Sequence, residues 1–426
     1  MNSVKEWFAN RFPAFYGQYV LIRNYRYLYL KRRHRRRIRA VRKEKKAKVV
    51  VIISNLAMWR LEDVVALLKK DSRFQVEIVV CPFTTFAPDV RKKNVDEVVS
   101  YLQGKGWDYI LADNQEDSEG LMKALDPDLV FYPQLYSGLY GKGLNLESNL
   151  GRLIAYVPYA LPTTSGDWSY NSRYFNVAWR LLYPTKLHYS YSRRHSFNHA
   201  RNMVIVGDSH ASAFLKEDHQ YPWKEGDRKK KVIWAPHFSI RTDGYLHRAS
   251  FLWLHQAMWE MAQEFKEKVQ FVFKPHPRLL SELYRHPDWG KERADAYFAR
   301  WKNGENTQLE TGPYIDLFCT SDAMVHDCGS FSAEYHYTGK PVLFVSKDFK
   351  DIYQGLDDFG TLCMDLHYRA GCLEEIHSFL QDVVLGRQDS RKMEREAFRR
   401  HCLIPSEGTS FERNVYQSIT RDLFKD

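Results

Sequence analysis

Residues 321–335 read SDAMVHDCGSFSAEY, and this stretch decides the fold that we expect. A short strand from Ala323 to His326 ends at Asp327, a turn of small residues follows, and a helix begins near Ser330. A strand that leads into a helix is the repeating part of a parallel sheet. We therefore expect more such pairs before and after this stretch.

The same alternation of strand and helix continues outward in both directions. In the second half we expect strands at 232–234, 269–273, 323–326 and 342–345, and helices at 251–265, 330–337, 373–384, 391–401 and 411–424. In the first half we expect strands at 49–54, 76–81, 109–111, 129–132 and 203–206, and helices at 61–69, 95–102, 121–125 and near 174–182. Two series of this kind predict an α/β protein of the GT-B class, in which two Rossmann-like doubly wound domains face each other.

Length and composition suggest where the domains begin and end. The chain has 426 residues, enough for two cores of ordinary size. A polar segment with a proline, a glycine and a run of charges is typical of an interdomain linker. We expect an arm at 1–47, an acceptor-side domain at 48–215, a linker at 216–231, a nucleotide-donor domain at 232–402 and a C-terminal helix at 403–426 that crosses back to the first domain.

The net charge of +11 belongs to one segment. Residues 31–48 contain twelve Lys or Arg and one Glu, which gives 12 − 1 = +11 and leaves the rest of the chain near neutral. Aromatic residues precede this block, and an anionic membrane surface attracts each basic residue by about 1 kcal/mol. We expect residues 5–48, a basic amphipathic arm, to dock on such a surface. The alternative is a helix that is solvated or packed on the body. Nucleic acid is not expected as a partner, because no nucleic-acid module accompanies the arm.

Cysteine spacing and hydropathy indicate a location. The six cysteines are irregularly spaced and include no CxxC pair, which favours a reduced compartment over a disulfide framework or a zinc ribbon. No run approaches the roughly 18 apolar residues that span a bilayer, and the N-terminus lacks the apolar region of a signal peptide. We expect a peripheral protein at the cytoplasmic face of the cell membrane.

Two histidines follow predicted strands of the second half. The segment FKPHPR places His276 between two prolines, which stiffen the backbone where a strand ends. His276 could protonate or hydrogen-bond a leaving phosphate, while Lys274 and Arg278 offset the charge of a diphosphate. The segment WAPHFS presents His237 after the first strand of this half. A structural role in a turn is the alternative for both histidines.

The turn after Asp327 is a candidate anion site. Backbone N–H groups at the start of the following helix, with the hydroxyls of Ser330 and Ser332, suit a phosphate. The alternative is a plain helix cap, since serine is a preferred capping residue. Cys328 lies in the same turn, but no ordered set of partners marks it as a nucleophile.

The order and spacing of three segments resemble the CDP-glycerol glycerophosphotransferases of teichoic acid and capsule synthesis. The segments are KPHP at 274–277, SDAMVHDCGSFSAEY at 321–335 and GKPVLFV at 339–345. The positions that coincide with the family pattern are His276, Asp327, Ser330, Glu334, Tyr335, Lys340 and Pro341.

This resemblance implies a GT-B enzyme that moves a polyol-phosphate group from a CDP-linked donor, such as CDP-glycerol, to a lipid-linked or polymer acceptor in cell-envelope synthesis. It implies no metal, and we expect no other cofactor. The catalytic candidates are His276, which would stabilise the CDP leaving group, and His237. The donor-binding candidates are Lys274, Arg278, Asp327, Ser330, Ser332 and Glu334.

The chain departs from the family pattern on the acceptor side. The family carries an aromatic-His-Gly segment there, whose histidine is the expected base. The nearest stretch in this chain, YVPYALP at 156–162, contains no histidine. His210 and Asp167 are the substitutes that we consider.

Other classes of function fit parts of the sequence. A GT-B glycosyltransferase with a CMP- or UDP-sugar donor is the main alternative, because a fold does not fix a function. A non-catalytic nucleotide-binding or scaffold protein is the second alternative. A metal enzyme based on His195 and His199 is disfavoured, because HExxH is absent and two arginines flank the pair. The segment GDSH at 207–210 lacks the GxSxG elbow of a serine hydrolase.

Overall fold

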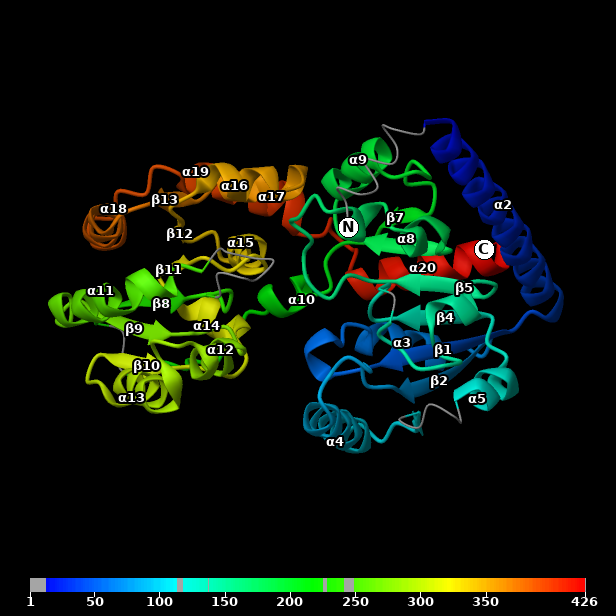
Figure 1. Cartoon of the computed structure of the whole chain (residues 1–426), viewed down its shortest axis with the longest axis horizontal. Helices are drawn as coiled ribbons and strands as arrows, with labels where there is room; N and C mark the ends of the chain where they lie inside the picture. Colours follow the sequence, from blue (N-terminus) through cyan, green and yellow to red (C-terminus); the bar gives the residue numbers. More distant parts are fainter. Residues whose placement is uncertain (1–12, 113–117, 137, 225–227, 241–248, 426) are drawn as a thin grey trace. The chain divides into compact units, whose positions relative to one another are not determined.

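The computed structural model describes residues 13–112, 118–136, 138–224, 228–240 and 249–425, apart from the side chains of residues 13–28, 167 and 168. The chain forms two compact units, and each unit contains a parallel sheet (Figure 1). Unit 1 consists of Met1–Tyr159, Asp167–Ser209 and Thr409–Asp426, and unit 2 consists of Ala160–Gly166 and His210–Gly408.

The sheet of unit 1 has seven parallel strands in the order β3-β2-β1-β4-β5-β6-β7. They are β1 (Ala47–Ile53), β2 (Phe74–Val80), β3 (Ile110–Leu111), β4 (Leu129–Tyr132), β5 (Leu153–Tyr156), β6 (Arg180–Tyr183) and β7 (Met203–Ile205). The central strands β1, β4 and β5 are apolar and buried apart from Lys48, as a sheet covered on both faces requires. The strands predicted at 49–54, 76–81, 109–111, 129–132 and 203–206 are therefore confirmed within a few residues.

One predicted helix of unit 1 is wrong in its second half. We expected a helix near 174–182, but α8 (Arg173–Val177) ends early and the chain continues as strand β6. Leu181 pairs with Tyr156 of β5 on one side and with Met203 of β7 on the other. An interior strand that is buried on both faces has a continuous apolar sequence, which periodicity cannot distinguish from a buried helix.

Helices cover this sheet. They are α2 (Pro13–Glu44), the 3₁₀ turn η1 (Leu56–Met58), α3 (Glu62–Lys70), α4 (Pro88–Gly104), α5 (Ser118–Leu125), α6 (Leu146–Asn149), α7 (Asp167–Tyr170), α8, α9 (Lys186–His195) and α20 (Phe411–Phe424). Helix α20 brings the end of the chain back to unit 1, where it contacts α2 and α3. Its buried residues recur every four positions at Phe411, Val415, Ile419 and Leu423, so one face of α20 completes the core.

Helix α2 includes the basic segment of the arm. Leu30, His34 and Val41 are buried at helical spacing, and the His34 ring bonds to the carbonyl of Leu150 at 2.9 Å. Arg42 donates to the carbonyl of Leu423 at the end of α20 at 3.1 Å. Residues 30–44 therefore pack on unit 1 through one face and expose the other, whereas the start of the arm lies outside the described residues. Among the described helices, none has the length and apolar character that a membrane crossing requires.

The sheet of unit 2 has six parallel strands in the order β10-β9-β8-β11-β12-β13. They are β8 (Lys230–Ala235), β9 (Val269–Phe273), β10 (Thr307–Leu309), β11 (Ala323–His326), β12 (Val342–Val345) and β13 (Tyr368–Ala370). The strand order reverses direction between β8 and β11. Such a reversal opens a crevice beyond the carboxyl ends of the two strands, and ligands of doubly wound sheets bind there.

The helices of unit 2 lie beside different strands of its sheet; α12 and α13 lie beside β9 and β10, and α18 lies beside β13 (Figure 1). The helices in the described residues of unit 2 are α10 (Ala211–Phe214), α11 (Phe251–Glu264), α12 (Leu279–Arg285), α13 (Gly290–Asn303), α14 (Ile315–Thr320), α15 (Phe331–Glu334), the 3₁₀ turn η2 (Tyr335–Thr338), α16 (Phe349–Gln354), α17 (Asp358–Asp365), α18 (Leu373–Ser378), the π-helical η3 (Phe379–Leu385), α19 (Lys392–Phe398) and the π-helical η4 (Arg399–Leu403). In the core, the ring of Trp234 on β8 stacks on Phe273 of β9 at 4.9 Å and on Phe251 of α11 at 5.9 Å. These contacts fix the ends of β8 and β9.

The segment expected to be a linker, 216–231, lies within unit 2. Trp223 is buried and donates to the hydroxyl of Thr320 at 2.9 Å, and Lys224 donates to the carbonyl of Lys302 at 2.6 Å. The division between the two units falls between Ser209 and His210.

Candidate functional site

Three candidate residues follow three adjacent strands of unit 2. His237 follows β8, His276 follows β9 and Asp327 follows β11, and these strands are neighbours in the sheet (Figure 1). Carboxyl ends of parallel strands meet at one edge. The strand order reverses between β8 and β11, so this edge includes the switch point of the sheet.

The loops after β8 and β9 run side by side. The N–H of Lys274 donates to the carbonyl of Trp234 at 2.8 Å, and the N–H of His276 donates to the carbonyl of Pro236 at 3.0 Å. Parallel pairing thus continues past the ends of the strands. The prolines on both sides of His276 supply no N–H of their own, so the His276 N–H is the donor that fixes this loop.

The side chains of the two loops stack on one another. The rings of His237 and His276 lie 5.1 Å apart in an edge-on arrangement. The ring of Phe238 lies 4.5 Å from that of His276, and the guanidinium of Arg278 lies 4.1 Å from the centre of the Phe238 ring. Two imidazoles and one cation are therefore held together around an aromatic ring.

Hydrogen bonds determine which nitrogen of His276 carries its proton. The N–H of Arg278 donates to Nδ1 of His276 at 3.1 Å, so a neutral His276 carries its proton on Nε2. Burial, followed by the charges of His237, Arg278 and Lys274, lowers the pKa of His276 to about 3. Around pH 7 His276 is therefore neutral, and its Nε2 can donate a hydrogen bond. The N–H of Ser239 donates to Nδ1 of His237 at 3.3 Å, which places the proton of that ring on Nε2 as well.

The carboxylate of Asp327 holds the neighbouring loop. It is buried, and its Oδ1 accepts the N–H of His237 at 2.5 Å. Its Oδ2 accepts the N–H of Ser250 at 2.5 Å and the Ser250 hydroxyl at 2.7 Å. Burial raises the pKa of Asp327 to about 6, and the three hydrogen bonds oppose that rise. We predicted Asp327 as a donor-binding residue, but the structure shows its oxygens bonded to the protein, where they position His237.

The other donor-binding candidates are distributed between the surface and the core. Arg278 is exposed and pairs with Glu282 at 3.1 Å, whereas Lys274 is buried and donates to the carbonyl of Gly312 at 2.8 Å. Burial lowers the pKa of Lys274. Ser330 is exposed at the start of α15, a helix of four residues.

Two of these candidates point into the core. The hydroxyl of Ser332 is buried and donates to the carbonyl of Cys328 at 3.0 Å. The side chain of Glu334 is buried within unit 2. Of the predicted set, the structure therefore gathers His237, His276, Arg278 and Asp327.

The residues of the alternative sites do not form comparable clusters. His195 is the last residue of α9 and stacks on Tyr191, while His199 follows the helix with a φ of 53°, so the two do not share a helix face. Across the described residues, no group of three or more His, Cys, Asp or Glu side chains is arranged to hold a metal ion. His210 is buried at the start of α10, and the side chain of Asp167 lies outside the described residues.

Two residues of the site carried little or no signal in the sequence. Phe238 belongs to the quoted segment WAPHFS, and its contact with His276 follows from the side-by-side loops. Ser250 lies 77 residues before Asp327, and no motif marks it. Only the tertiary structure shows that it completes the bonds of the carboxylate.

A family model matches the part of the chain that carries this site. Residues 216–359 match the family described as CDP-Glycerol:Poly(glycerophosphate) glycerophosphotransferase. The matched range contains His237, His276 and Asp327, and it confirms the predicted resemblance for this part of the chain. No curated protein matches the sequence.

Solved structures resemble the whole fold at low sequence identity. The UDP-GlcNAc 2-epimerase from Neisseria meningitidis bound to UDP-GlcNAc has a TM-score of 0.58 at 15% identity, over 89% of this chain and 100% of that one. A putative UDP-N-acetylglucosamine 2-epimerase from Listeria monocytogenes has a TM-score of 0.57 at 15% identity, over 89% and 98%. The wall teichoic acid polymerase TagF, in a structure soaked with CDPG, has a TM-score of 0.55 at 13% identity, over 95% and 98%. Likeness at this level shows the fold, and it confirms the predicted class of two Rossmann-like units of GT-B type.

Proposed function

We propose that this chain, whose residues 216–359 match the glycerophosphotransferase family, moves a glycerol-phosphate-like group from a CDP-linked donor to an acceptor in the synthesis of a cell-envelope polymer. One observation carries the proposal. His237, His276 and Asp327 follow three adjacent strands at the switch point of the sheet, and all three lie in the matched range. Ligands of doubly wound sheets bind at such a point.

The proposed reaction forms one phosphodiester bond and breaks the phosphoanhydride bond of the CDP-linked donor. An acceptor hydroxyl oxygen attacks the phosphorus that carries the glycerol group. The bond from this phosphorus to the bridging oxygen breaks, and CMP leaves with that oxygen. The hydroxyl proton passes to a base on the acceptor side or to solvent. Negative charge develops on the leaving phosphate of CMP, and hydrogen-bond donors that are already in place there stabilise the transition state.

His276 is the proposed donor to that leaving phosphate. Its neutral ring carries a proton on Nε2, and its position is fixed by the bond from Arg278 N–H and by the contact with Phe238. The positive charges that help to lower the pKa of His276 also attract a diphosphate. In return, a bound diphosphate favours the protonated ring, which would allow His276 to transfer a proton as CMP leaves.

The exposed face of α2 is the proposed contact with an anionic membrane surface on the cytoplasmic side. Leu30, His34 and Val41 face unit 1. The exposed cations of the same helix are Arg32, Arg33, Arg35, Arg36, Arg39 and Lys43. Replacing Arg32, Arg35, Arg36 and Arg39 with Gln removes four charges without touching the packed face. We expect this variant to lose most of its co-sedimentation with anionic vesicles, since each basic residue contributes about 1 kcal/mol. Unchanged sedimentation would refute membrane docking by α2.

A screen of nucleotide-linked donors tests the proposed reaction. We expect CMP release from CDP-glycerol or CDP-ribitol, also in EDTA because the proposal includes no metal. Turnover with a CMP- or UDP-sugar alone would favour the glycosyltransferase alternative. Neither turnover nor nucleotide binding would favour a scaffold.

Substitution of His276 tests its role within that reaction. His276→Ala should lower kcat by about 100-fold or more, as loss of one preorganised donor does elsewhere, with little change in thermal stability. His401→Ala, on an exposed histidine of η4, is the matched control and should leave kcat unchanged. A fully active His276→Ala enzyme would exclude the leaving-group role.

A further inference from the structure

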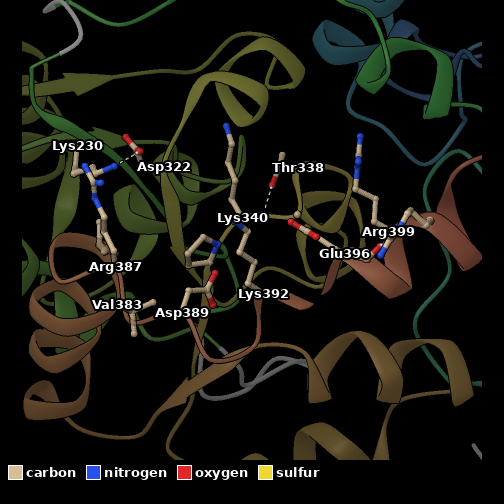
Figure 2. Close-up of a pocket in the computed structure, with 14 residues that line it drawn as sticks. Lys230, Asp322, Thr338, Lys340, Val383, Arg387, Asp389, Lys392, Glu396 and Arg399 are labelled. Atoms are coloured by element: carbon tan, nitrogen blue, oxygen red, sulfur yellow. Dashed lines mark hydrogen bonds and ion pairs between the residues drawn. The ribbon is translucent and has the colours of Figure 1, made fainter. Parts of the chain in front are cut away.

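A cavity of unit 2 lies at the opposite end of the same sheet from His237, His276 and Asp327. Its volume is about 470 Å³, and Figure 2 shows the side chains that line it. Lys230 begins β8, Asp322 directly precedes β11, and Lys340 and Pro341 directly precede β12, so the cavity lies at the amino ends of the strands. Strand β8 has six residues, which separates the two edges by about 20 Å at 3.3 Å per residue. The cavity is therefore distinct from the site around His276.

The lining of this cavity carries an excess of positive charge. It contains the six cations Lys230, Lys340, Arg387, Lys392, Arg399 and Arg400 and the three carboxylates Asp322, Asp389 and Glu396. Lys230 pairs with Asp322 at 2.7 Å, and Asp389 pairs with the buried Arg395 behind the lining. Two carboxylates are thus already neutralised. The other five cations are accompanied by one further carboxylate, Glu396, which forms no ion pair with any described residue.

Three of the five cations bond to backbone carbonyls of the protein. Lys340 Nζ donates to the carbonyl of Cys319 at 2.5 Å, and Arg399 Nε donates to the carbonyl of Tyr337 at 2.6 Å. Arg400 donates to a carbonyl one turn earlier in its own helix. Helices that cross over a parallel sheet end at this edge, and cations near their last carbonyls are favourable. Helix capping therefore explains part of the basic character.

Arg387 and Lys392 are not explained in this way. Both side chains are exposed at the cavity, and in the described part of the chain neither side chain makes a hydrogen bond or an ion pair (Figure 2). Arg387 has a φ of 58° and follows Gly386, the C-cap residue of η3. Glycine is the usual residue in this left-handed conformation after a helix, and any residue with a Cβ is strained there. Arg387 therefore adopts a strained backbone conformation, and its guanidinium makes no ion pair with the described residues that would offset this strain.

We infer that this cavity binds a phosphodiester chain, with Arg387 and Lys392 as direct contacts of its phosphates. A volume of about 470 Å³ exceeds what one phosphate fills, and the cations come from several elements around it, which suits an anion with more than one phosphate group. The anionic character of the ligand rests on the cavity itself. Its identity as a segment of a glycerol-phosphate polymer rests on the proposed function, because that reaction makes phosphodiesters. The polymer would thus be held at one edge of the sheet while the donor reacts at the other.

Binding of a synthetic oligo(glycerol phosphate) to the full chain tests this inference. The test variant is Arg387→Gln/Lys392→Gln, and the matched control is Lys216→Gln/Lys350→Gln, which removes the same charge from exposed lysines of unit 2 outside the cavity. We expect the test variant to weaken oligomer binding by about tenfold in calorimetry at 0.1 M salt and the control to change it by less than about twofold. Tripolyphosphate should compete with the oligomer. CMP release from CDP-glycerol with a short soluble acceptor should be the same in both variants.

Each result supports or overturns a specific part of the inference. Equal oligomer affinity in the test variant and the wild type, or equal loss in the two variants, overturns the cavity as the site. Binding of tripolyphosphate but not of the oligomer overturns the polymer as ligand, and binding only to anionic vesicles assigns the phosphodiester to lipid headgroups instead. If the wild type binds the oligomer through Arg387 and Lys392 but does not release CMP, the proposed reaction fails and the anion site stands.

Discussion

Replacing Asp327 with asparagine tests whether this carboxylate positions the loop that carries His237. The substitution keeps the size of the side chain and changes one oxygen into an NH₂ group. In the structure Oδ1 accepts one hydrogen bond, from His237 N–H, and Oδ2 accepts two from Ser250. All three partners are donors, so an NH₂ group at either position faces another donor.

The expected loss of stability follows from these contacts. The less costly orientation of the amide keeps its oxygen towards Ser250 and turns NH₂ towards His237 N–H. One hydrogen bond to a charged acceptor is lost, and a buried donor is left without a partner, which together cost about 2–3 kcal/mol. For a unit of this size each 1 kcal/mol lowers Tm by about 2–4 °C, so we expect Asp327→Asn to lower the Tm of unit 2 by about 4–12 °C.

Thermal and urea unfolding of the full chain measure this effect. Asp351→Asn is the control, since it removes the same charge from an exposed carboxylate of α16 in the same unit. Ser250→Ala removes one of the three bonds and should cost about 1 kcal/mol. Asp327→Asn should also raise KM for the donor more than Asp351→Asn does, because His237 is no longer fixed. A Tm and a KM equal to those of the control would show that the carboxylate does not hold this loop.

Two further predictions concern stability. The pKa values of the three buried histidines of unit 2, His326, His336 and His367, are lowered by burial. The unfolded chain therefore binds more protons than the folded one, and stability should fall as the pH drops from about 6.5 to 5 at up to about 1.4 kcal/mol per pH unit for each histidine. In urea unfolding, His336→Gln should remove about one third of this group's contribution to the slope; a slope equal to that of the wild type would contradict the assignment. In unit 1, Ile419→Ala on the buried face of α20 should cost about 2–5 kcal/mol, whereas Gln417→Ala on its exposed face should cost less than about 0.5 kcal/mol.

The sequence was sufficient to predict the central strands of unit 2. The predicted bounds of β9, β11 and β12 agree with the structure, because each is a short apolar run with a charged residue or a proline at its end. The edge strands β10 (Thr307–Leu309) and β13 (Tyr368–Ala370) were missed. Each has three residues and is partly exposed, so neither gives a run long enough to stand out from a loop.

The candidate site was predictable where it depends on topology and was missed where it depends on individual hydrogen bonds. His237 and His276 follow two consecutive strands of the predicted series, and in the structure their rings meet. The partners of Asp327 lie 77 and 90 residues earlier in the chain. Spacing along the sequence places a carboxylate at a strand end, but it does not show whether a ligand or the protein supplies the donors. The same limit applies to Ser332, whose residue type suggests an anion contact and whose hydroxyl donates to the carbonyl of Cys328 in the structure.

Lys340 and Asp327 both coincide with the family pattern, but the topology of the sheet places them in two different sites. The resemblance groups Lys340 and Asp327 in one pattern, and in the chain only twelve residues lie between them. Asp327 follows β11, whereas Lys340 precedes β12, and the two strands are parallel neighbours. A residue after one parallel strand and a residue before the next lie at opposite edges of the sheet, because the chain crosses over between them. It follows that Lys340 cannot belong to the cluster around His276, and its bond to the carbonyl of Cys319 at the end of α14 agrees with this. Lys340 and Pro341 coincide with the family pattern but precede a strand, so their role differs from that of Asp327. In this chain they line the cavity at the amino ends of the strands.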